Sequence, residues 1–295
     1  MSVERSSRGE WREMLPRGRP FLKMHGLRNH FIIVDGRDDP WRPDAEEAVR
    51  LCDQQAGVGA DQIVVIEKPS AAGEAGGALA FVRFWNVDGR EVEACGNATR
   101  CVAWLLLEEQ AADHVLLETR AGVLKGRRIG LQQVSTGMGD ISMDWRRIPL
   151  AEERDTCHLD LQYGPLHDPV ALNIGNPHLV FFVHNVDDVD LETLAPRIQN
   201  DPLFPQSVNV GIAEMLSDSR MRLKVYERGA GQTMACGSGA CVAVFAALAR
   251  GLTECHRMTV TLPGGDLDIE ILADGSAVMA GPVEYCFSGD LPRFG

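Results

Sequence analysis

The chain has 295 residues, of which 45% are hydrophobic and 24% charged, and its formal net charge at pH 7 is −13. This length accommodates one large domain or two ordinary ones with a substantial core, and the acidic balance argues against a nucleic-acid partner, because that kind of binding relies on Lys and Arg to neutralise phosphates. No apolar run approaches the roughly 18 residues of a membrane-spanning helix, so a membrane partner is not expected either.

The first twenty residues mix Arg and Glu and contain no continuous apolar segment of the secretory type. We expect residues 1–20 to form a flexible extension and the protein to remain in the cytoplasm. The eight cysteines should then stay reduced, so no disulfide framework is expected. A zinc site is not expected, because the sequence has no Cys-x-x-Cys and no His pair at ligand spacing.

Runs rich in Val, Ile and Phe predict β-strands, which outnumber the predicted helices. The strand pattern begins at Phe21, and strand-like runs at residues 31–35, 62–67 and 80–85 precede a helix from residue 97 to about 109. A strand at 115–118 follows. Further strands at 179–183 and 222–226 precede a second helix from residue 238 to about 250, which Gly251 ends. Each helix follows a Cys-Gly pair.

These two helix starts belong to an internal repeat. Residues 93–103 and 234–243 align with one gap, and their cysteines, Cys95 and Cys236, are 141 residues apart (236 − 95). Asn86 and Glu227 precede the two cysteines by the same interval. A shift close to half the chain predicts two copies of one mixed sheet-and-helix unit that face each other across a cleft with quasi-twofold symmetry. The join is expected near residues 137–140.

The position of the two cysteines indicates their chemistry. Unsatisfied N–H groups and the positive end of the dipole at a helix N-terminus favour anions, so we expect the placement of Cys95 and Cys236 to lower the pKa of each thiol. Inverting a tetrahedral carbon by proton transfer needs a base on one face and an acid on the other, and two symmetry-related cysteines supply both. The same helix starts can bind a substrate carboxylate. The sequence therefore predicts an epimerase of a small amino-acid substrate that uses neither cofactor nor metal.

Other functions remain open on these residues alone. The two-cysteine arrangement does not specify a substrate side chain, so a racemase of histidine, proline or hydroxyproline on the same scaffold is the nearest alternative. A redox protein with a switching disulfide between Cys95 and Cys236 is the alternative from another class, although we expect oxidation there to be a lesion. A purely structural or binding role leaves the duplicated helix starts unexplained. The cysteines expected to be structural are Cys52, Cys101, Cys157, Cys241, Cys255 and Cys286.

From about Phe21 to near the C-terminus, the chain resembles the diaminopimelate epimerase family. The resemblance implies an α+β fold of two pseudo-symmetric repeated half-barrel domains, each a mostly antiparallel sheet wrapped around a central helix, assembled as a homodimer. The halves would be residues 21–137, carrying Cys95, and 138–282, carrying Cys236, with residues 283–295 returning to the first half. The matching segments are Lys23-Met24-His25-Gly26-Leu27, Gly57-Val58-Gly59-Ala60-Asp61-Gln62, Asn86-Val87-Asp88-Gly89, Ala94-Cys95-Gly96-Asn97, Gly175-Asn176-Pro177-His178, Tyr226-Glu227-Arg228-Gly229-Ala230-Gly231 and Ala235-Cys236-Gly237-Ser238-Gly239.

The resemblance also implies an activity and a set of site residues. The activity is cofactor-independent conversion of L,L-2,6-diaminopimelate to the meso form, on the route to lysine and peptidoglycan. Cys236 would take the proton from the L centre and Cys95 would donate the proton that forms the D centre, with His178 and Glu227 tuning the pair. The residues implied at the substrate are Asn29, Gln62, Asn86, Gly96, Asn97, Asn176, Asn209, Glu227, Arg228, Gly237 and Ser238.

Two features of this set bear on the substrate. The planar guanidinium of Arg228 suits a second substrate carboxylate. Where the family commonly has Gly-Leu-Gly-Asn-Asp, this chain has Gly26-Leu27-Arg28-Asn29-His30. Asn29 is kept. Arg28 and His30 differ in charge from the family residues, and the sequence does not decide how they affect the choice of substrate.

Overall fold

The computed structural model describes residues 18–93 and 95–291 of the chain. The β-branched and aromatic runs form its strands, because such side chains pack well on a half-buried pleated surface. The first half consists of β1 (Arg19–Gly26), β2 (Asn29–Asp35), α2 (Ala45–Cys52), β3 (Gln62–Glu67), α3 (Ala71–Ala75), β4 (Ala80–Asn86), β5 (Glu91–Val92), α4 (Gly96–Gln110), β6 (His114–Thr119), β7 (Gly122–Gly130) and β8 (Gln133–Asp140).

The rest of the described chain, which is the second half and one final strand, begins with a small hairpin. It consists of β9 (Gln162–Tyr163), β10 (Leu166–His167), β11 (Val170–Asn173), β12 (Pro177–Phe182), the 3-10 turn η1 (Val186–Asp188), α5 (Leu191–Gln199), β13 (Asn209–Ser217), β14 (Arg220–Glu227), β15 (Gly231–Gln232), α6 (Gly237–Ala249), β16 (Arg257–Leu262), β17 (Gly265–Ile271), β18 (Ser276–Pro282) and β19 (Glu284–Leu291). Every predicted strand and both predicted long helices are confirmed, with ends shifted by at most a few residues. The first strand begins at Arg19 instead of Phe21, and the rest of the predicted extension, residues 1–17, lies outside the described residues.

The strands of the two halves pair in the same order and direction. In the first half β1 and β2 are antiparallel, β2 runs parallel to β3, β3 is antiparallel to β4, β4 runs parallel to β6, and β6, β7 and β8 are successively antiparallel. The second half repeats this pattern with β11, β12, β13, β14, β16, β17 and β18. The predicted α+β fold of two pseudo-symmetric repeats is therefore confirmed.

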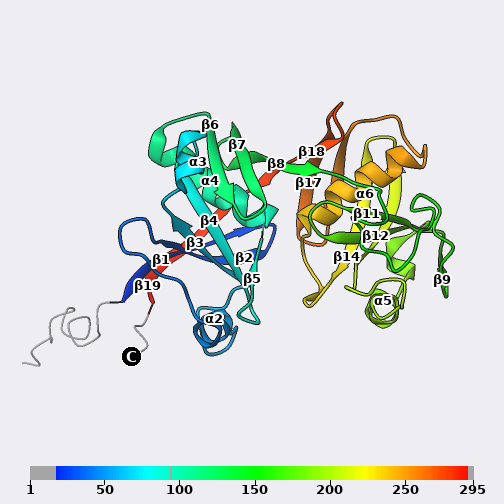
Figure 1. Ribbon diagram of the computed structural model, residues 1–295, viewed down its shortest axis with the longest axis horizontal. Coiled ribbons are helices and arrows are strands. Elements are labelled where there is room, and N and C mark those ends of the chain that lie inside the picture. The colour runs from blue at the N-terminus through cyan, green and yellow to red at the C-terminus, as the bar shows by residue number, and fades with distance from the viewer. Residues whose placement is uncertain (1–17, 94, 292–295) are drawn as a thin grey trace, which may run out of the picture.

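Each half wraps its sheet around one helix, α4 in the first lobe and α6 in the second (Figure 1). Helix α6 is apolar almost all round because strands enclose it, and its residues Val242 and Val244 are fully buried. In α4, Val102 and Leu106 pack in a core cluster with Phe84 of β4. Each such buried side chain stabilises the fold by about 1.5–3 kcal/mol, so this packing holds each helix in place within its sheet.

The two lobes share one sheet. Strands β8 and β18, the last of each repeat, pair antiparallel from Gln133 opposite Pro282 to Asp140 opposite Ser276. Residue 138, the predicted start of the second half, therefore lies within β8. Strand β19 then runs back to the first lobe and pairs with β1, so the two ends of the described chain lie side by side (Figure 1). Within residues 18–93 and 95–291, no helix is long and apolar enough to cross a membrane.

Candidate active site

Cys95 and Cys236 each occupy the residue that immediately precedes a central helix. Their backbones are extended, with φ −146° and ψ 111° at Cys95 and φ −121° and ψ 104° at Cys236, so the chain enters each helix directly from an extended segment. Cys95 is half-buried and Cys236 is buried. The Cys236 thiol accepts a hydrogen bond from the Gly239 N–H at 3.4 Å. Both cysteines therefore stand at helix N-termini, as the repeat predicted.

Burial controls the protonation of both thiols. Loss of hydration raises the pKa of Cys95 to about 11, although the N–H group of Ala98 acts in the opposite direction. Burial and the negative charge of Glu227 raise the pKa of Cys236 well above its ordinary value. The expectation that the helix starts lower these pKa values is therefore wrong, because desolvation of the anion outweighs the helix-start N–H groups. Both groups are thiols at neutral pH.

The two helix starts meet between the lobes. Asn97, in the first turn of α4, donates from Nδ2 to the carbonyl of Ala235 in the loop before α6, at 3.1 Å. Gly96 and Gly237 both pack on Met279 of β18, since a Cβ at Gly96 would lie 2.8 Å from Met279 Cε and one at Gly237 would lie 2.6 Å from Sδ. The absence of a side chain at both glycines lets the two cysteine-bearing helix starts share one methionine.

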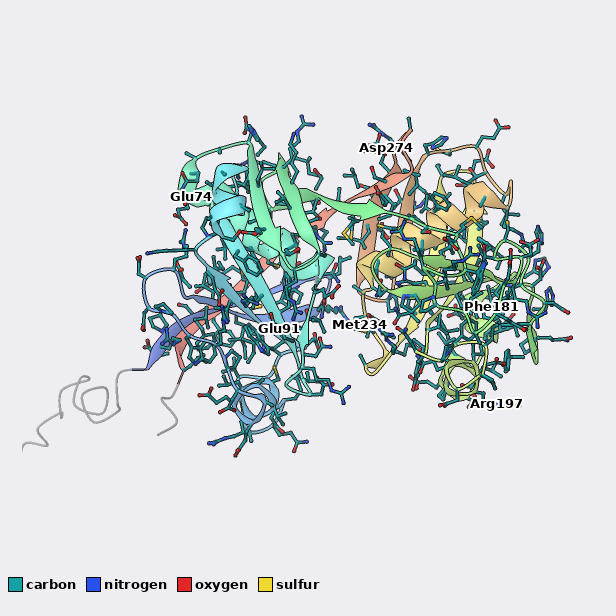
Figure 2. The ribbon with its side chains drawn as sticks, viewed as in Figure 1. Glu74, Glu91, Phe181, Arg197, Met234 and Asp274 are labelled. Carbon is teal, nitrogen blue, oxygen red and sulfur yellow. The ribbon has the colours of Figure 1, made fainter. Side chains whose placement is uncertain are left out.

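The loop that leads into α6 also contacts the first lobe. Figure 2 shows Met234 of this loop in the region between the two lobes. The Met234 carbonyl accepts a hydrogen bond from the Gly264 N–H at 2.7 Å. Gly264, in the turn between β16 and β17, packs against the backbone of Leu27 in the first lobe. The position of Cys236 is therefore set by contacts from both lobes.

A polar cluster surrounds Ser238 in the first turn of α6. Ser238 Oγ lies 3.5 Å from Cys236 Sγ and 3.0 Å from His178 Nε2. The same imidazole nitrogen lies 3.1 Å from Asn176 Oδ1 and 3.4 Å from Asn209 Nδ2. Burial lowers the pKa of His178 to about 3, so the ring is neutral at physiological pH. A neutral imidazole is thus connected to the Cys236 thiol through a single hydroxyl group.

Glu227, the last residue of β14, places a carboxyl group beside Cys236. It accepts a hydrogen bond from Thr233 Oγ at 2.6 Å and interacts with the Cys236 thiol. Burial raises the pKa of Glu227. A part-buried carboxyl group of raised pKa next to a thiol can exchange a proton with it. Thr233 was not among the predicted residues, because no pattern distinguishes a lone threonine in a loop.

The first lobe contributes a set of amides. Gln62, the first residue of β3, donates from Nε2 to Oδ1 of Asn86, the last residue of β4, at 2.7 Å. Asn29, the first residue of β2, accepts from Asn97 Nδ2 at 3.2 Å and donates to Asp61 Oδ2 at 3.1 Å. Gln62 Oε1 is buried and lacks a partner within the part of the chain that the structure describes. It is therefore available to a donor on a ligand. Asp61 is a further residue that the predicted site did not include.

The repeat symmetry is broken at the histidine. Gln62 begins β3 and Asn209 begins β13, so the two are equivalent. Phe31 stands opposite Gln62 in the parallel pair of β2 and β3, whereas His178 stands opposite Asn209 in the parallel pair of β12 and β13. The first lobe thus carries a phenylalanine where the second carries an imidazole. The two cysteines consequently have different surroundings.

Arg228 stands apart from this buried group. Its side chain is exposed, with Nη1 donating to the Gln206 carbonyl at 2.8 Å, and its backbone N–H donates to Asn209 Oδ1 at 2.8 Å. The remaining guanidinium donors can therefore meet a carboxylate that enters from solvent.

The site as a whole is equipped for proton transfer and for binding a zwitterion. It contains two thiols, a part-buried carboxyl group, a neutral imidazole, several amides and an exposed guanidinium. Among residues 18–93 and 95–291, no group of three or more His, Cys, Asp or Glu side chains is arranged to hold a metal ion.

Comparisons with known proteins give matches in sequence and in fold. The sequence model of the family described as diaminopimelate epimerase matches residues 21–143 and 170–286. The chain is 46% identical to the diaminopimelate epimerase of Phenylobacterium zucineum strain HLK1 over 93% of its own length and 98% of the relative's. It is 44% identical to that of Caulobacter sp. strain K31, with the same coverage. Among solved structures, a phenazine biosynthesis protein of the PhzF family from Bacillus anthracis has a TM-score of 0.66 at 15% identity and covers 94% of this chain and 100% of its own.

Proposed function

The chain belongs to the diaminopimelate epimerase family, and on that premise we propose that Cys95 and Cys236 act as the base and acid of its reaction. The protein is an isomerase that epimerises diaminopimelate, a reaction of lysine biosynthesis. We propose that the L,L form becomes the meso form and that the product also supplies peptidoglycan. The observation that carries the mechanism is that two thiols stand at helix N-termini whose first turns meet at Asn97 and Met279.

Substrate binding is proposed to use both lobes. The α-carboxylate of the reacting centre would lie at the two helix starts, where free N–H groups and both helix dipoles favour negative charge. The groups there are Gly96, Asn97, Gly237 and Ser238. The amides of Asn29, Gln62, Asn86, Asn176 and Asn209 would bind the ammonium groups and the remaining polar atoms. The exposed guanidinium of Arg228 would bind the distal carboxylate, which the fixed fork of its donors suits.

The proton transfers balance between the two cysteines. The Cys236 thiolate takes the α-proton from the L centre, and the electron pair of the broken C–H bond stays on the α-carbon. The Cys95 thiol then delivers its proton to the opposite face, which gives the D centre and leaves Cys95 as thiolate. The reverse reaction exchanges the roles. Both proton-transfer groups and the helix N-termini that stabilise the developing charge belong to the chain, so the proposal needs no cofactor.

Glu227 and His178 are proposed to set the protonation of Cys236. Since burial favours the thiol form of Cys236, its proton must leave before the reaction can start. The Glu227 carboxylate can receive this proton, because it is part-buried and its pKa is raised. His178 holds Ser238 at 3.0 Å, which leaves the serine hydroxyl placed to donate to the thiolate that results.

The test is α-proton exchange in D2O. Reduced enzyme is incubated with L,L-diaminopimelate, deuterium incorporation is followed by mass spectrometry, and inversion is followed by chiral chromatography. Cys95→Ser and Cys236→Ser should each lower the rate of inversion by about 100- to 10,000-fold, the usual contribution of a general acid or base. Cys157→Ser, at a half-buried cysteine outside the site, should leave the rate unchanged.

Two outcomes would contradict the proposal in different ways. Full inversion activity in the double variant Cys95→Ser/Cys236→Ser would remove the cysteines from the mechanism. L-Histidine, L-proline and L-lysine are run in parallel. Inversion of one of these in place of diaminopimelate would keep the two-cysteine mechanism and change the substrate.

A further inference from the structure

Arg100 is a fully buried cation in the second turn of α4. Its Nε and Nη2 atoms have no hydrogen-bond partner, and no carboxylate pairs with its guanidinium, within residues 18–93 and 95–291. Burying an arginine without a carboxylate is costly, because the charge loses its hydration. Packing alone therefore does not explain why Arg100 is buried here.

Arg100 donates a hydrogen bond to Asn97, the residue that joins the two helix starts. Its Nη1 donates to Asn97 Oδ1 at 2.9 Å. An amide has its acceptor and its donors on opposite sides, so fixing the oxygen directs Nδ2 away from Arg100. Asn97 Nδ2 accordingly donates to Asn29 at 3.2 Å and to the carbonyl of Ala235, the residue before Cys236, at 3.1 Å. The arginine thereby determines which way the amide between the two cysteine-bearing loops points.

Arg100 also contacts the methionine that both helix starts share. Its Nη1 lies 3.3 Å from Met279 Sδ, and Met279 packs on Gly96 and Gly237. The surrounding backbone leaves room for the guanidinium: a Cβ at Gly26 would lie 2.9 Å from Nη2, and one at Gly281 would lie 3.4 Å from Cζ. The guanidinium therefore occupies a space that glycines of β1 and β18 leave open.

The second repeat indicates that the fold alone does not need this arginine. Both helices begin directly after their cysteine, so by helical position, counted without the gap of the sequence alignment, Arg100 in α4 corresponds to Cys241 in α6. Cys241 is also fully buried, so the same position accepts a small neutral side chain in the other copy of the unit. The large cation occurs only in the lobe that carries Asn97.

We propose that Arg100 is a positioning residue of the epimerase reaction, which holds Asn97 and Met279 so that Cys95 and Cys236 face the same α-carbon from opposite sides. The proposal rests on the two-cysteine mechanism proposed above. The positive charge of Arg100 also lowers the pKa of Cys95, against the effect of burial. It thereby stabilises the thiolate that Cys95 becomes at the end of the forward reaction.

The test uses the full-length enzyme with Arg100→Met, Arg100→Lys and the control Val102→Ala. Val102 is a fully buried α4 residue in the core of the first lobe, so its truncation reports loss of helix packing without loss of the Asn97 contact. Arg100→Met should lower kcat by about 10- to 100-fold, the effect of misplacing reacting groups by roughly 1 Å, with a smaller change in KM. Lysine can still donate to Asn97, so Arg100→Lys should recover part of kcat.

A second readout separates positioning from stability. When Cys95 is misplaced, Cys236 can return a solvent-derived deuteron to the face from which it took the proton, so deuterium enters L,L-diaminopimelate with retention. The ratio of this exchange to inversion should therefore rise in Arg100→Met and Arg100→Lys and stay at the wild-type value in Val102→Ala. The melting temperature of each variant is measured alongside.

An unchanged ratio and kcat in folded Arg100→Met, with a lower melting temperature alone, would overturn the positioning role. If Arg100→Met does not fold, the ratio of exchange to inversion in Arg100→Lys tests the positioning role instead, and an unchanged ratio would overturn it. Failure of the two-cysteine mechanism is recognised separately, because the cysteine variants of the wild-type background would then retain inversion.

Discussion

Cys95 and Cys236 are each exposed to two opposing influences. Helix-start N–H groups stabilise a thiolate, whereas the enclosing side chains deprive it of water, and for both residues the second influence is the larger. Sequence alone predicted the first influence, because a cysteine directly before a helix is visible in the pattern. It did not predict the second, because the degree of enclosure depends on how the other lobe closes over the helix start.

The raised thiol pKa values predict how activity depends on pH. Only the thiolate is a base, and burial raises the pKa of Cys236, the base of the forward reaction, well above its ordinary value. In Glu227→Gln the proton of Cys236 must leave to solvent, so from about pH 6.5 to 8.5 kcat/KM of this variant should rise close to tenfold per pH unit, more steeply than in the wild type, where Glu227 receives the proton. The measurement is initial rates of inversion in buffers of constant ionic strength, with the rate of thiol alkylation by iodoacetamide as an independent probe. A plateau of the Glu227→Gln profile below about pH 8 would show that the helix starts dominate instead.

Arg228 should determine the preference for a substrate with two carboxylates. Arg228→Gln removes the charged fork but keeps a polar group, and the loss of a hydrogen bond to a charged group, about 1.5–3 kcal/mol, corresponds to roughly 10- to 150-fold in kcat/KM for diaminopimelate. An analogue that lacks the distal carboxylate should lose little. Arg220→Gln, at the exposed opposite end of β14, is the control. Equal losses in kcat/KM with both substrates would show that Arg228 does not determine which substrate the site prefers.

At the scale of elements, the repeat explains why the site residues occur in pairs. Strand β4 ends at Asn86 and strand β14 ends at Glu227, and each is followed by a two-residue strand, β5 or β15, and then by its cysteine and helix. The sequence predicted these elements because their residues repeat along the chain. It did not predict the contacts of Met279 or Arg100, because these depend on β18 of one lobe packing beside α4 of the other.

The turn between β16 and β17 provides a test of the contact between lobes. A Cβ at Gly264 would lie 2.2 Å from the Leu27 carbonyl oxygen and 2.9 Å from that of Met234, and backbone atoms cannot move aside as a side chain can. Gly264→Ala should therefore destabilise the protein by roughly 1–3 kcal/mol and lower kcat, because it separates the loop before Cys236 from the first lobe. Urea denaturation and inversion rates measure the two effects. Gly137→Ala, where a Cβ meets nothing within 4 Å, should change neither, and equal behaviour of the two variants would argue against the clash.

At the scale of the whole molecule, two pairings between distant segments create the architecture. The pairing of β8 with β18 joins the lobes, and that of β19 with β1 ties the C-terminal end to the first lobe. Neither pairing has a local signal in the sequence. Only the family resemblance led to the expectation that residues 283–295 return to the first half. A strand shows which face it buries, but not which distant strand it will pair with.

The free edge of this sheet bears on the homodimer that the family resemblance implies. Among the described strands β19 pairs only with β1, and its Tyr285 and Phe287 are each 48% exposed. An edge strand with exposed aromatic side chains offers unpaired backbone groups and apolar area to a partner, so we expect two copies of the chain to associate through β19. Light scattering should then give twice the chain mass of 32.3 kDa, and Tyr285→Lys/Phe287→Lys should give the single mass, because the added charges repel across a twofold interface. Leu131→Lys, at an 86% exposed residue between β7 and β8, should leave the mass unchanged. A wild-type protein that is already monomeric would rule out the homodimer. A β19 double variant that remains dimeric would show that the dimer surface lies elsewhere.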